Sequence, residues 1–408
     1  MRNKNQDLEK IAISLDITPT MYQYAVDRYN GMASFLQGKG VSAEIYPQGS
    51  FRTGTVVRPM KDGREADYDI DLVCELALRK EATAPCFVKN IVGDLLKNDG
   101  VYAPKLRPEE NRCWTLDYAD VSDGIGLSMD VVPCVHESDN GMMLLRIKGV
   151  PPEYANEAVE ITDRISAGHY EWLPSNPSGY GKWFDDINRR FMEHNFRERK
   201  ARFFTENRNL FAANAKVEEV PDALIKSSLQ RTIQLLKRHR DIFYYRAKAW
   251  DKRPISAIIV TLSALIAKNS PYLNLDDLLP YVANGMADYA ELLQGRRPRN
   301  ETAAAPKSYI RREMQKWVIR NPVNPDDNFA DTWDDDTAAM FFKWVSAVED
   351  ELGHSTPIEE RKYITSLQRA FGSSAVEKAI GPIAAAPGII TSQSTSKPIS
   401  PTRPWGGE

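Results

Sequence analysis

Carboxylates at alternate positions of one short stretch are the most chemically informative feature of this chain. The stretch runs from Ala66 to Val73 and carries Asp67, Asp69 and Asp71 between apolar residues. Successive side chains of a β-strand point to opposite faces, so the three carboxylates share one face while the apolar residues pack on a core. Negative charges this close together repel each other unless a cation neutralises them. Mg²⁺, which takes carboxylate oxygens, waters and substrate phosphates as ligands, is the natural cation, with Mn²⁺ as an alternative.

A turn that could hold phosphate precedes the acidic stretch. Gly49 and Ser50 lie where a helix can begin, and the exposed N–H groups of a glycine turn and a helix start favour anions. A cation site next to a phosphate holder is the arrangement expected of an enzyme that acts on nucleoside triphosphates.

A third carboxylate, Asp130, lies in the downstream stretch Leu127–Val132, in which apolar and polar residues alternate again. Pairing of the two strands would bring Asp130 beside Asp69 and Asp71. Three inward carboxylates suit catalysis with two metal ions about 3.5–4 Å apart, which stabilise the attacking and leaving oxygens. Asp-x-Asp alone is a common surface pattern, but its strand setting and the third aspartate favour the metal site.

In this order the motifs resemble the DNA-polymerase-β-like nucleotidyltransferases. The spacing from Ser50 to Asp69 is longer than in many members, which indicates an inserted loop around Arg58–Arg64. Further stretches are similar to the bacterial cGAS/DncV-like nucleotidyltransferases, the signal synthases of CBASS anti-phage operons. The resemblance covers most of the chain from the Gly-Ser turn to about Trp333. These further stretches are Pro174–Phe184, Leu229–Asp241, Arg253–Ser256 and Asn321–Asp331.

The resemblance implies a mechanism as well as a fold. The Gly-Ser turn would hold the β- and γ-phosphates of the donor, and the Asp-x-Asp pair would bind both Mg²⁺ ions. The later aspartate would bind the ion that lowers the pKa of the acceptor ribose hydroxyl, which attacks the α-phosphorus as pyrophosphate leaves. A second transfer in the same cleft would close a ring. The implied catalytic and metal-binding residues are Asp69, Asp71 and Asp130, and the implied nucleotide-binding residues are Gln48, Gly49, Ser50, Lys237 and Ser256.

Two members of this set have ordinary alternatives when the residues are considered without the resemblance. Lys237 follows Leu236 by about one-third of a helical turn, so it can face the catalytic strands or be an exposed helix cation. Ser256 follows Pro254 and can simply cap a helix. Only the resemblance gives these two side chains contacts with the triphosphate.

The sequence does not decide which residues would contact the nucleobase. Tyr180, Trp183 and Phe184 could stack on nucleobases, but aromatic residues beside Pro and Gly are more often part of an interdomain core. The Asn321–Asp331 segment offers polar groups for base edges, or is simply a loop punctuated by proline. Base identity, linkage type and ring size do not follow from motif spacing.

Hydrophobic periodicity indicates the elements that position these residues. The order of strands and helices predicts an α+β fold, with a polymerase-β-like catalytic lobe built on a mixed or antiparallel sheet and an α-helical second lobe. An apolar stripe over Ile225, Leu229, Ile233 and Leu236 predicts one buried helix face. Strands are expected at Ala43–Pro47, Ala66–Glu75, Trp114–Tyr118 and Leu127–Pro133, and helices at Leu8–Gln37, Ala84–Asn98, Ile255–Ala267, Leu275–Asn284, Lys307–Val318, Ala338–Leu352 and Ile358–Phe371.

We expect three regions along the chain. Residues 1–200 form the catalytic lobe with its N-terminal helix, and residues 201–380 form the helical lobe that closes the nucleotide cleft. Residues 381–408 are rich in Ala, Pro, Ser and Gly and cannot support a packed core, so this tail is expected to be disordered. In some systems of the resembled family an accessory protein conjugates the synthase's C-terminus to targets. An inert tail is the alternative.

Composition indicates a soluble, cytoplasmic enzyme with small substrates. The formal net charge of −3 lacks the basic excess of a protein that grips long nucleic acid, so no such partner is expected. The first residues show no apolar signal region, and the longest apolar run, Pro254–Ala267, is too short to span a bilayer, so no membrane association is expected. The four cysteines lack metal-ligand spacing and fit free thiols in a reducing compartment.

Together with the resemblance, these features predict a Mg²⁺-dependent nucleotidyltransferase. It would join ribonucleoside triphosphates, ATP or GTP or both, into a cyclic di- or trinucleotide second messenger for anti-phage defence. The product's partner would be a downstream effector that senses the cyclic nucleotide. One alternative is a related nucleotidyltransferase that makes linear oligonucleotides or modifies a protein, tRNA or small molecule. The other is a non-catalytic nucleotide-binding scaffold, against which the acidic residues argue.

Overall fold

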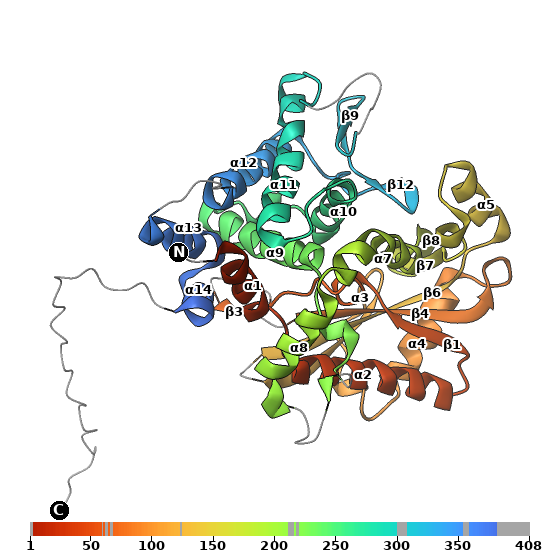
Figure 1. Cartoon of the computed structure of the whole chain (residues 1–408). Helices are drawn as coiled ribbons and strands as arrows, with labels where there is room; N and C mark the ends of the chain where they lie inside the picture. Colours follow the sequence, from red (N-terminus) through yellow and green to blue (C-terminus); the bar gives the residue numbers. More distant parts are fainter. Residues whose placement is uncertain are drawn as a thin grey trace, which may run out of the picture.

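Strands and helices of this chain separate into two neighbouring groups in a computed structural model (Figure 1). The main sheet lies with α2 (Pro19–Gly38) and α4 (Pro85–Lys97), while α9 to α14 gather beside it. The residues that the structure describes are 3–58, 60–61, 64–65, 68–122, 125–210, 216–217, 220–299, 308–353 and 359–381.

The main sheet is mixed, as the sequence predicts, and its central pair of strands is parallel. In the described part of the chain it has six strands. The parallel pair is β4 (Tyr68–Arg79) with β6 (Ile125–His136), and the other pairs of this sheet are antiparallel. The strand order is β1 (Ala43–Pro47), β4, β6, β7 (Val159–Ser166) and β8 (His169–Ser175), with β5 (Trp114–Ser122) also paired to β6.

The alternating apolar residues of β4 pack on a core, as the sequence predicts. Tyr68, Ile70 and Leu72 are buried in a core formed with α2 and α4. In α4 the helix comes very close to the sheet at Gly93, where an added Cβ would lie 2.1 Å from the ring of the fully buried Trp114. Packing on this side therefore fixes which face of β4 carries the carboxylates.

The second group of elements surrounds α9 (Ser228–Ala247), which begins with a capping box between Ser227 and Gln230. The expected apolar stripe is buried, although Ile225 lies just before the helix. Polar side chains of α9 are buried too, so the helix is enclosed on all sides over much of its length. Its neighbours include α1 (Lys4–Ser14), α7 (Pro177–Glu193), α10 (Ser256–Ala267), α11 (Leu275–Ala287), α12 (Asp335–Leu352) and α13 (Glu360–Phe371).

The remaining elements are short and lie mostly at the edges of these two groups. They are α3 (Gly49–Arg52), α5 (Asp139–Ile147), α6 (Pro152–Ala155), α8 (Phe196–Glu206), α14 (Ser373–Ile380), β2 (Met60–Lys61), β3 (Arg64–Glu65), β9 (Arg311–Glu313), β10 (Lys316–Val318), β11 (Arg320–Asn321) and β12 (Asn324–Asn328).

The helix expected over Leu8–Gln37 is in fact two helices, α1 and α2. Thr18 caps the second helix through its side chain, and Pro19 occupies the first turn, so the chain restarts there. The apolar residues of α1 belong to the core of the helical group rather than to that of the sheet. The predicted division of the chain at residue 200 stays a prediction.

The helix expected over Lys307–Val318 is wrong in its described part. The strands β9 and β10 form a hairpin there, joined by Met314 and Gln315, which both adopt positive φ angles of 45° and 69°. Trp317 on β10 is buried in the helical core. Val318, the next residue of β10, is buried as well.

Some predictions fall on residues that the structure does not describe. They concern Asp67, parts of the expected loop around Arg58–Arg64, and all of the expected tail except Gly381. Among the described residues, none of the helices combines the length and the apolar character needed to cross a membrane.

Buried donors on α9 connect the two groups of elements. Four side chains of this helix donate hydrogen bonds to backbone carbonyls of residues 53–58, in the loop that follows the Gly-Ser turn. The donor and acceptor pairs are Gln230 to Thr53 at 2.9 Å, Lys237 to Thr55 at 3.0 Å, Gln234 to Val56 at 2.7 Å and Arg238 to Arg58 at 3.1 Å.

The same helix holds the link between α1 and α2 through Asp16. Nη1 of Arg231 lies 2.6 Å from Oδ2 of Asp16, and Nε2 of Gln234 lies 2.7 Å from Oδ1. The Arg231 side chain is only 5% exposed, so its charge depends on a close carboxylate.

Asp16→Ala is expected to lower the free energy of unfolding by about 3 kcal/mol, because it leaves a buried guanidinium without its nearest carboxylate. Asp16→Asn keeps an acceptor for Arg231 and Gln234 and should lose less. The control is Asp94→Ala, since Asp94 is exposed and only 3.8 Å from Lys97; it should change stability by less than about 0.5 kcal/mol. Urea unfolding measures all three, and equal losses at Asp16 and Asp94 would contradict the assignment.

Candidate active site

The Gly-Ser turn lies directly against the strand that carries the acidic residues. Gly49 begins α3 with a φ of 60°, a conformation that glycine adopts without strain. A Cβ added to Gly49 would lie 2.6 Å from Oδ2 of Asp71. The backbone N–H of Gln48 donates to the backbone carbonyl of Asp71 at 2.8 Å. Glycine is thus required here for both the turn and the close approach of a carboxylate.

The predicted carboxylates lie on the central parallel strands. Asp71 on β4 is the register partner of Asp130 on β6, and Asp69 pairs with Ser128, two positions along the same face. The hydroxyl of Thr115 on β5 donates to Oδ1 of Asp130 at 2.6 Å. The structure therefore places Asp71 and Asp130 side by side and Asp69 next to them.

Burial, with the negative charges of Asp130 and Asp69, raises the pKa of Asp71 to about 6, while Lys237 opposes the shift. Within the described residues, no three acidic, His or Cys side chains form a ready-made metal cluster. The three aspartates nevertheless fit a divalent cation, because they offer only acceptor oxygens and share one face. Their mutual repulsion, visible in the pKa of Asp71, is the interaction that a cation would remove.

Lys237 reaches the site from α9. Its side chain is buried, and Nζ donates to the carbonyl of Thr55 at 3.0 Å. Burial and the charge of Arg240 lower its pKa to about 7, while Asp241 and Asp71 oppose the shift. The alternative of an exposed helix cation is therefore wrong.

Ser256 begins α10, but its hydroxyl does not cap this helix. The N-cap position is Ile255, and Nη1 of Arg240 donates to Oγ of Ser256 at 3.2 Å. With its oxygen engaged by a buried guanidinium, the Ser256 hydroxyl keeps its proton for another acceptor. The capping alternative is wrong for this serine.

One cavity brings the predicted nucleotide-binding residues together. It has a volume of about 250 Å³ and lies where the Gly-Ser turn meets α7, α9, α10 and the β11–β12 hairpin. Gln48, Gly49, Ser50, Lys237 and Ser256 all line it, and Asp71 lies behind Gly49. The other lining residues are Thr53, Ser175, Asn176, Pro177, Tyr180, Ala257, Val260, Asn321, Asp327 and Phe329.

The aromatic residues after the Pro-Ser segment are mainly core residues. Trp183 and Phe184 are buried in the helical core, so the interdomain-core alternative is correct for them. Tyr180 lines the cavity, but its ring contacts Trp183 and its hydroxyl lies 2.8 Å from that of Thr261. Phe329, which sequence reasoning did not single out, is also partly buried and lines the cavity; no periodic signal marks it.

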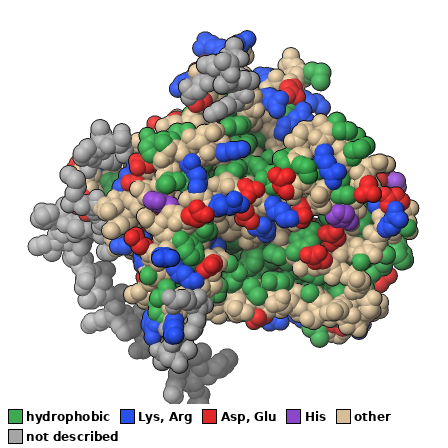
Figure 2. Space-filling view, turned by 45° about the vertical axis from the view of Figure 1, so that its right-hand side comes forward, with side chains coloured by type: hydrophobic (Ala, Val, Ile, Leu, Met, Phe, Trp, Pro, Cys, Tyr) green, Lys and Arg blue, Asp and Glu red, His purple; other side chains and the backbone are tan. Residues whose placement is uncertain are grey.

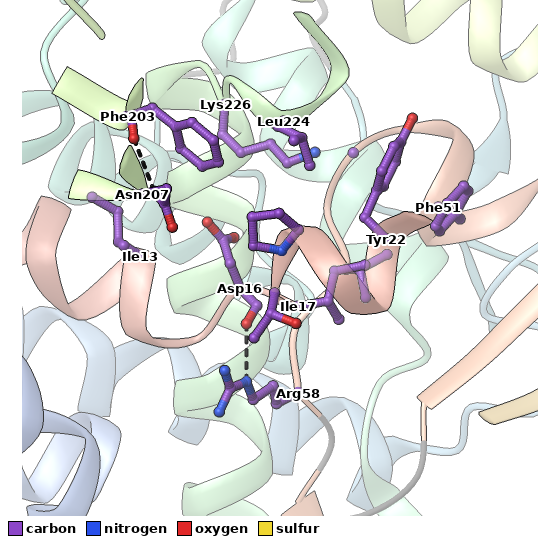
Figure 3. Close-up of a pocket in the computed structure, with 14 residues that line it drawn as sticks. Ile13, Asp16, Ile17, Tyr22, Phe51, Arg58, Phe203, Asn207, Leu224 and Lys226 are labelled. Atoms are coloured by element: carbon purple, nitrogen blue, oxygen red, sulfur yellow. Dashed lines mark hydrogen bonds between the residues drawn. The ribbon is translucent and has the colours of Figure 1, made fainter. Parts of the chain in front are cut away.

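A second cavity, of about 130 Å³, lies between α1, α2, α8 and the loop after the Gly-Ser turn (Figure 3). None of the predicted site residues lines it. The carboxylate that lines this second cavity is Asp16, which accepts hydrogen bonds from Arg231 and Gln234. The backbone carbonyl of Asp16 accepts a hydrogen bond from Arg58. The predicted nucleotide-binding residues therefore line the first cavity and not this one. On the face drawn in Figure 2, the described acidic and basic side chains are interspersed, and neither sign forms a continuous patch.

The comparisons with known proteins agree with this geometry. The family model described as "Cyclic GMP-AMP synthase DncV-like, nucleotidyltransferase domain" matches residues 43–128, which contain the turn and two of the aspartates. A c-di-GMP synthase of Roseivirga ehrenbergii is 25% identical over 387 residues, which are 91% of this chain and 85% of that protein. The cyclic dinucleotide synthase CdnG of Bradyrhizobium diazoefficiens is 26% identical over 337 residues, 80% of this chain and 69% of that one.

The fold agrees as well. The structure of the Bradyrhizobium CdnG, solved in complex with GTP, has a TM-score of 0.65 and 21% identity, and covers 92% of this chain and 98% of that chain. Residues 43–128 thus match a DncV-like nucleotidyltransferase domain, and most of the chain is similar to bacterial cyclic dinucleotide synthases, which supports nucleotidyltransferase activity.

Proposed function

We propose that this enzyme joins ribonucleoside triphosphates, ATP or GTP or both, into a cyclic di- or trinucleotide second messenger. The observation that carries the proposal is the cavity in which all five predicted nucleotide-binding residues meet, with Asp71 directly behind Gly49. The names of the two relatives, a c-di-GMP synthase and a cyclic dinucleotide synthase, support a cyclic product.

In this proposal the chain's own residues hold the triphosphate at several points. The N–H groups of the glycine turn and the ammonium of Lys237 contact phosphate oxygens, for which a compact positive charge is suited. The hydroxyl of Ser256 donates one hydrogen bond, and Arg240 sets its direction. Tyr180 keeps its place in the core and does not stack on a base.

The three aspartates would hold Mg²⁺, or Mn²⁺ as an alternative, and Asp71 must be ionised to do so. The bound ion supplies charge stabilisation at the phosphates and a lower pKa for the attacking ribose hydroxyl. Thr115 keeps Asp130 oriented by occupying one of its oxygens. No nucleophile from the protein is required, because the attacking group belongs to the acceptor nucleotide.

We further propose the biological setting that the family suggests. The enzyme would act in the cytoplasm, a downstream effector would sense its product in anti-phage defence, and long nucleic acid would not be a partner. The C-terminal tail would be available to a conjugation partner. Blots for covalent adducts of the full chain and of a chain truncated before residue 391, each expressed with its operon partners, test the last point.

Incubation of the purified enzyme with the four ribonucleotides and Mg²⁺ tests the activity. After phosphatase treatment, mass spectrometry should find a product with no terminal phosphate and the mass of a cyclic oligonucleotide. A linear oligonucleotide, or transfer only to an added protein or tRNA, would favour the related nucleotidyltransferases instead. Absence of any nucleotide consumption would favour the scaffold.

The double substitution Asp69→Asn with Asp71→Asn should abolish product formation. Thermal stability without metal should hold or rise, because two repelling charges are removed from one strand face. Stabilisation by Mg²⁺ with a triphosphate should disappear, and thermal unfolding with and without these ligands measures it independently of turnover. Asp94→Asn, on the exposed face of α4, is the control. Synthesis near the wild-type rate by the double variant would overturn the site.

Lys237 generates a pH dependence that can be measured. Its pKa of about 7 should rise when a triphosphate binds, so binding takes up a proton above pH 7 and weakens as pH rises. Between pH 7.5 and 8.5 the Kd of a non-hydrolysable triphosphate with Mg²⁺ should increase by about threefold to tenfold. Asp71 is ionised throughout this window and does not contribute to the slope.

Two variants isolate that effect. Lys237→Met should bind more weakly at every pH and lose the slope, whereas Lys237→Arg, which stays charged, should bind with little pH dependence. Calorimetric titration at constant Mg²⁺ gives the three profiles. A wild-type profile as flat as that of Lys237→Arg would rule out the assigned contact.

A further inference from the structure

One carboxylate in the nucleotide cavity has no role in the chemistry described above. Asp327 lies on β12 and lines the cavity with Asn321 of β11 and with Phe329. Nδ2 of Asn321 donates to Oδ2 of Asp327 at 3.0 Å, and Oδ1 of Asn321 accepts the backbone N–H of Val323 at 3.1 Å. Because Asn321 is engaged at both ends, it holds the Asp327 carboxylate in one orientation.

The hairpin that carries Asp327 is anchored to the sheet lobe. The buried Asn176 donates to the carbonyl of Val323, and Asn324 donates to the carbonyl of Pro174, both at 3.3 Å. An ion pair between Lys148 and Asp326 adds a third contact at the surface. The position of Asp327 is thus set relative to the Gly-Ser turn on the opposite wall of the cavity.

Asp327 keeps acceptor capacity for a ligand. Within the described residues, Oδ1 of Asp327 accepts no hydrogen bond, and no Lys or Arg forms an ion pair with this carboxylate. The nearby Arg320 is already engaged by Glu313 and by the carbonyl of Pro325. An ionised carboxylate accepts several hydrogen bonds, so the contact with Asn321 leaves room for two more donors.

Phe329 supplies a flat apolar surface next to this carboxylate. Its backbone N–H donates to the carbonyl of Ile319 at 2.9 Å, and its ring meets that of Tyr180 edge to face at 6.4 Å between centroids. The ring is only partly buried and lines the cavity. Aromatic rings of this kind stack on nucleobases of any type, so the ring contributes binding without choosing the base.

A carboxylate held in one orientation, in contrast, distinguishes between nucleobases. Guanine has two adjacent N–H donors on its Watson–Crick edge, N1–H and the 2-amino group, which match the two oxygens of a carboxylate. Adenine presents an acceptor, N1, at the corresponding position, and cytosine presents N3, so a carboxylate repels both. Uracil offers one N–H between two acceptors. A site that presents two acceptor oxygens disfavours bases that place an acceptor there, because their lone pairs face the carboxylate oxygens.

From this arrangement we infer that Asp327 selects guanine for the nucleotide held in this cavity, with Phe329 stacking on the base. The inference rests on the proposed function and names the substrate class of the same site. It assigns to the β11–β12 hairpin the base-reading role that the sequence leaves open.

Initial rates with GTP and with ATP, each as sole nucleotide and with Mg²⁺, test the inference in the full-length enzyme. Wild type should prefer GTP. Asp327→Asn, which replaces one acceptor by a donor, should lower kcat/KM for GTP by about 10- to 100-fold and leave that for ATP unchanged or raised. Asp331→Asn, an exposed aspartate outside the cavity, is the matched control and should keep the wild-type preference.

Inosine triphosphate gives a second test that needs no variant. It lacks only the 2-amino group, so wild type should use it about tenfold less well than GTP, and Asp327→Asn should hardly distinguish the two. Unchanged GTP preference in Asp327→Asn, or a wild type that uses inosine triphosphate as well as GTP, would overturn the assignment.

The two proposals fail in different ways. A wild type that prefers ATP overturns the role of Asp327 but leaves the proposed function intact, provided that transfer still depends on Asp69 and Asp71. A wild type that consumes no nucleotide at all overturns both.

Discussion

Buried hydrogen bonds from one helix to a loop backbone hold the candidate active site together. Residues 53–58 form no regular strand or helix, so their carbonyls need partners if they are to be buried. Gln230, Gln234, Lys237 and Arg238 of α9 supply them. Each lost bond would leave a buried polar group unpaired at a cost of about 1–3 kcal/mol. The helical lobe therefore fixes the path of the chain directly after the phosphate turn, and a change in α9 is a change in the site.

The pKa values of Lys237, which lines the cavity, and of Asp71, behind Gly49, are both shifted toward neutral pH. Burial moves the pKa of Asp71 up to about 6 and that of Lys237 down to about 7, so each is closer to neutral than the free amino acid at physiological pH. A cation favours the ionised form of Asp71, and a triphosphate favours the charged form of Lys237. In the proposed function, a bound cation and a triphosphate would supply the opposite charges for these two groups. The same low-polarity setting makes those interactions stronger than they would be in water.

Sequence reasoning succeeded where one face of an element is apolar. Alternation in β4 and β6 located the aspartates, although it did not show that these strands run parallel. It was incomplete for α9: the expected apolar stripe is buried, but period rules do not show that polar residues such as Lys237 are buried too, with backbone partners. It failed for the hairpin of β9 and β10, whose turn uses Met314 and Gln315 at positive φ and so carries no glycine signal. The place of Asp327 depends on contacts between residues far apart in the chain, which spacing does not encode.

The missing side chain at Gly49 has a consequence for substitution at this position. Any other residue at this position would both strain the turn and collide with the Asp71 carboxylate. This one residue therefore serves both the turn and the close approach of Asp71. No substitution at this position can change one of the two and keep the other.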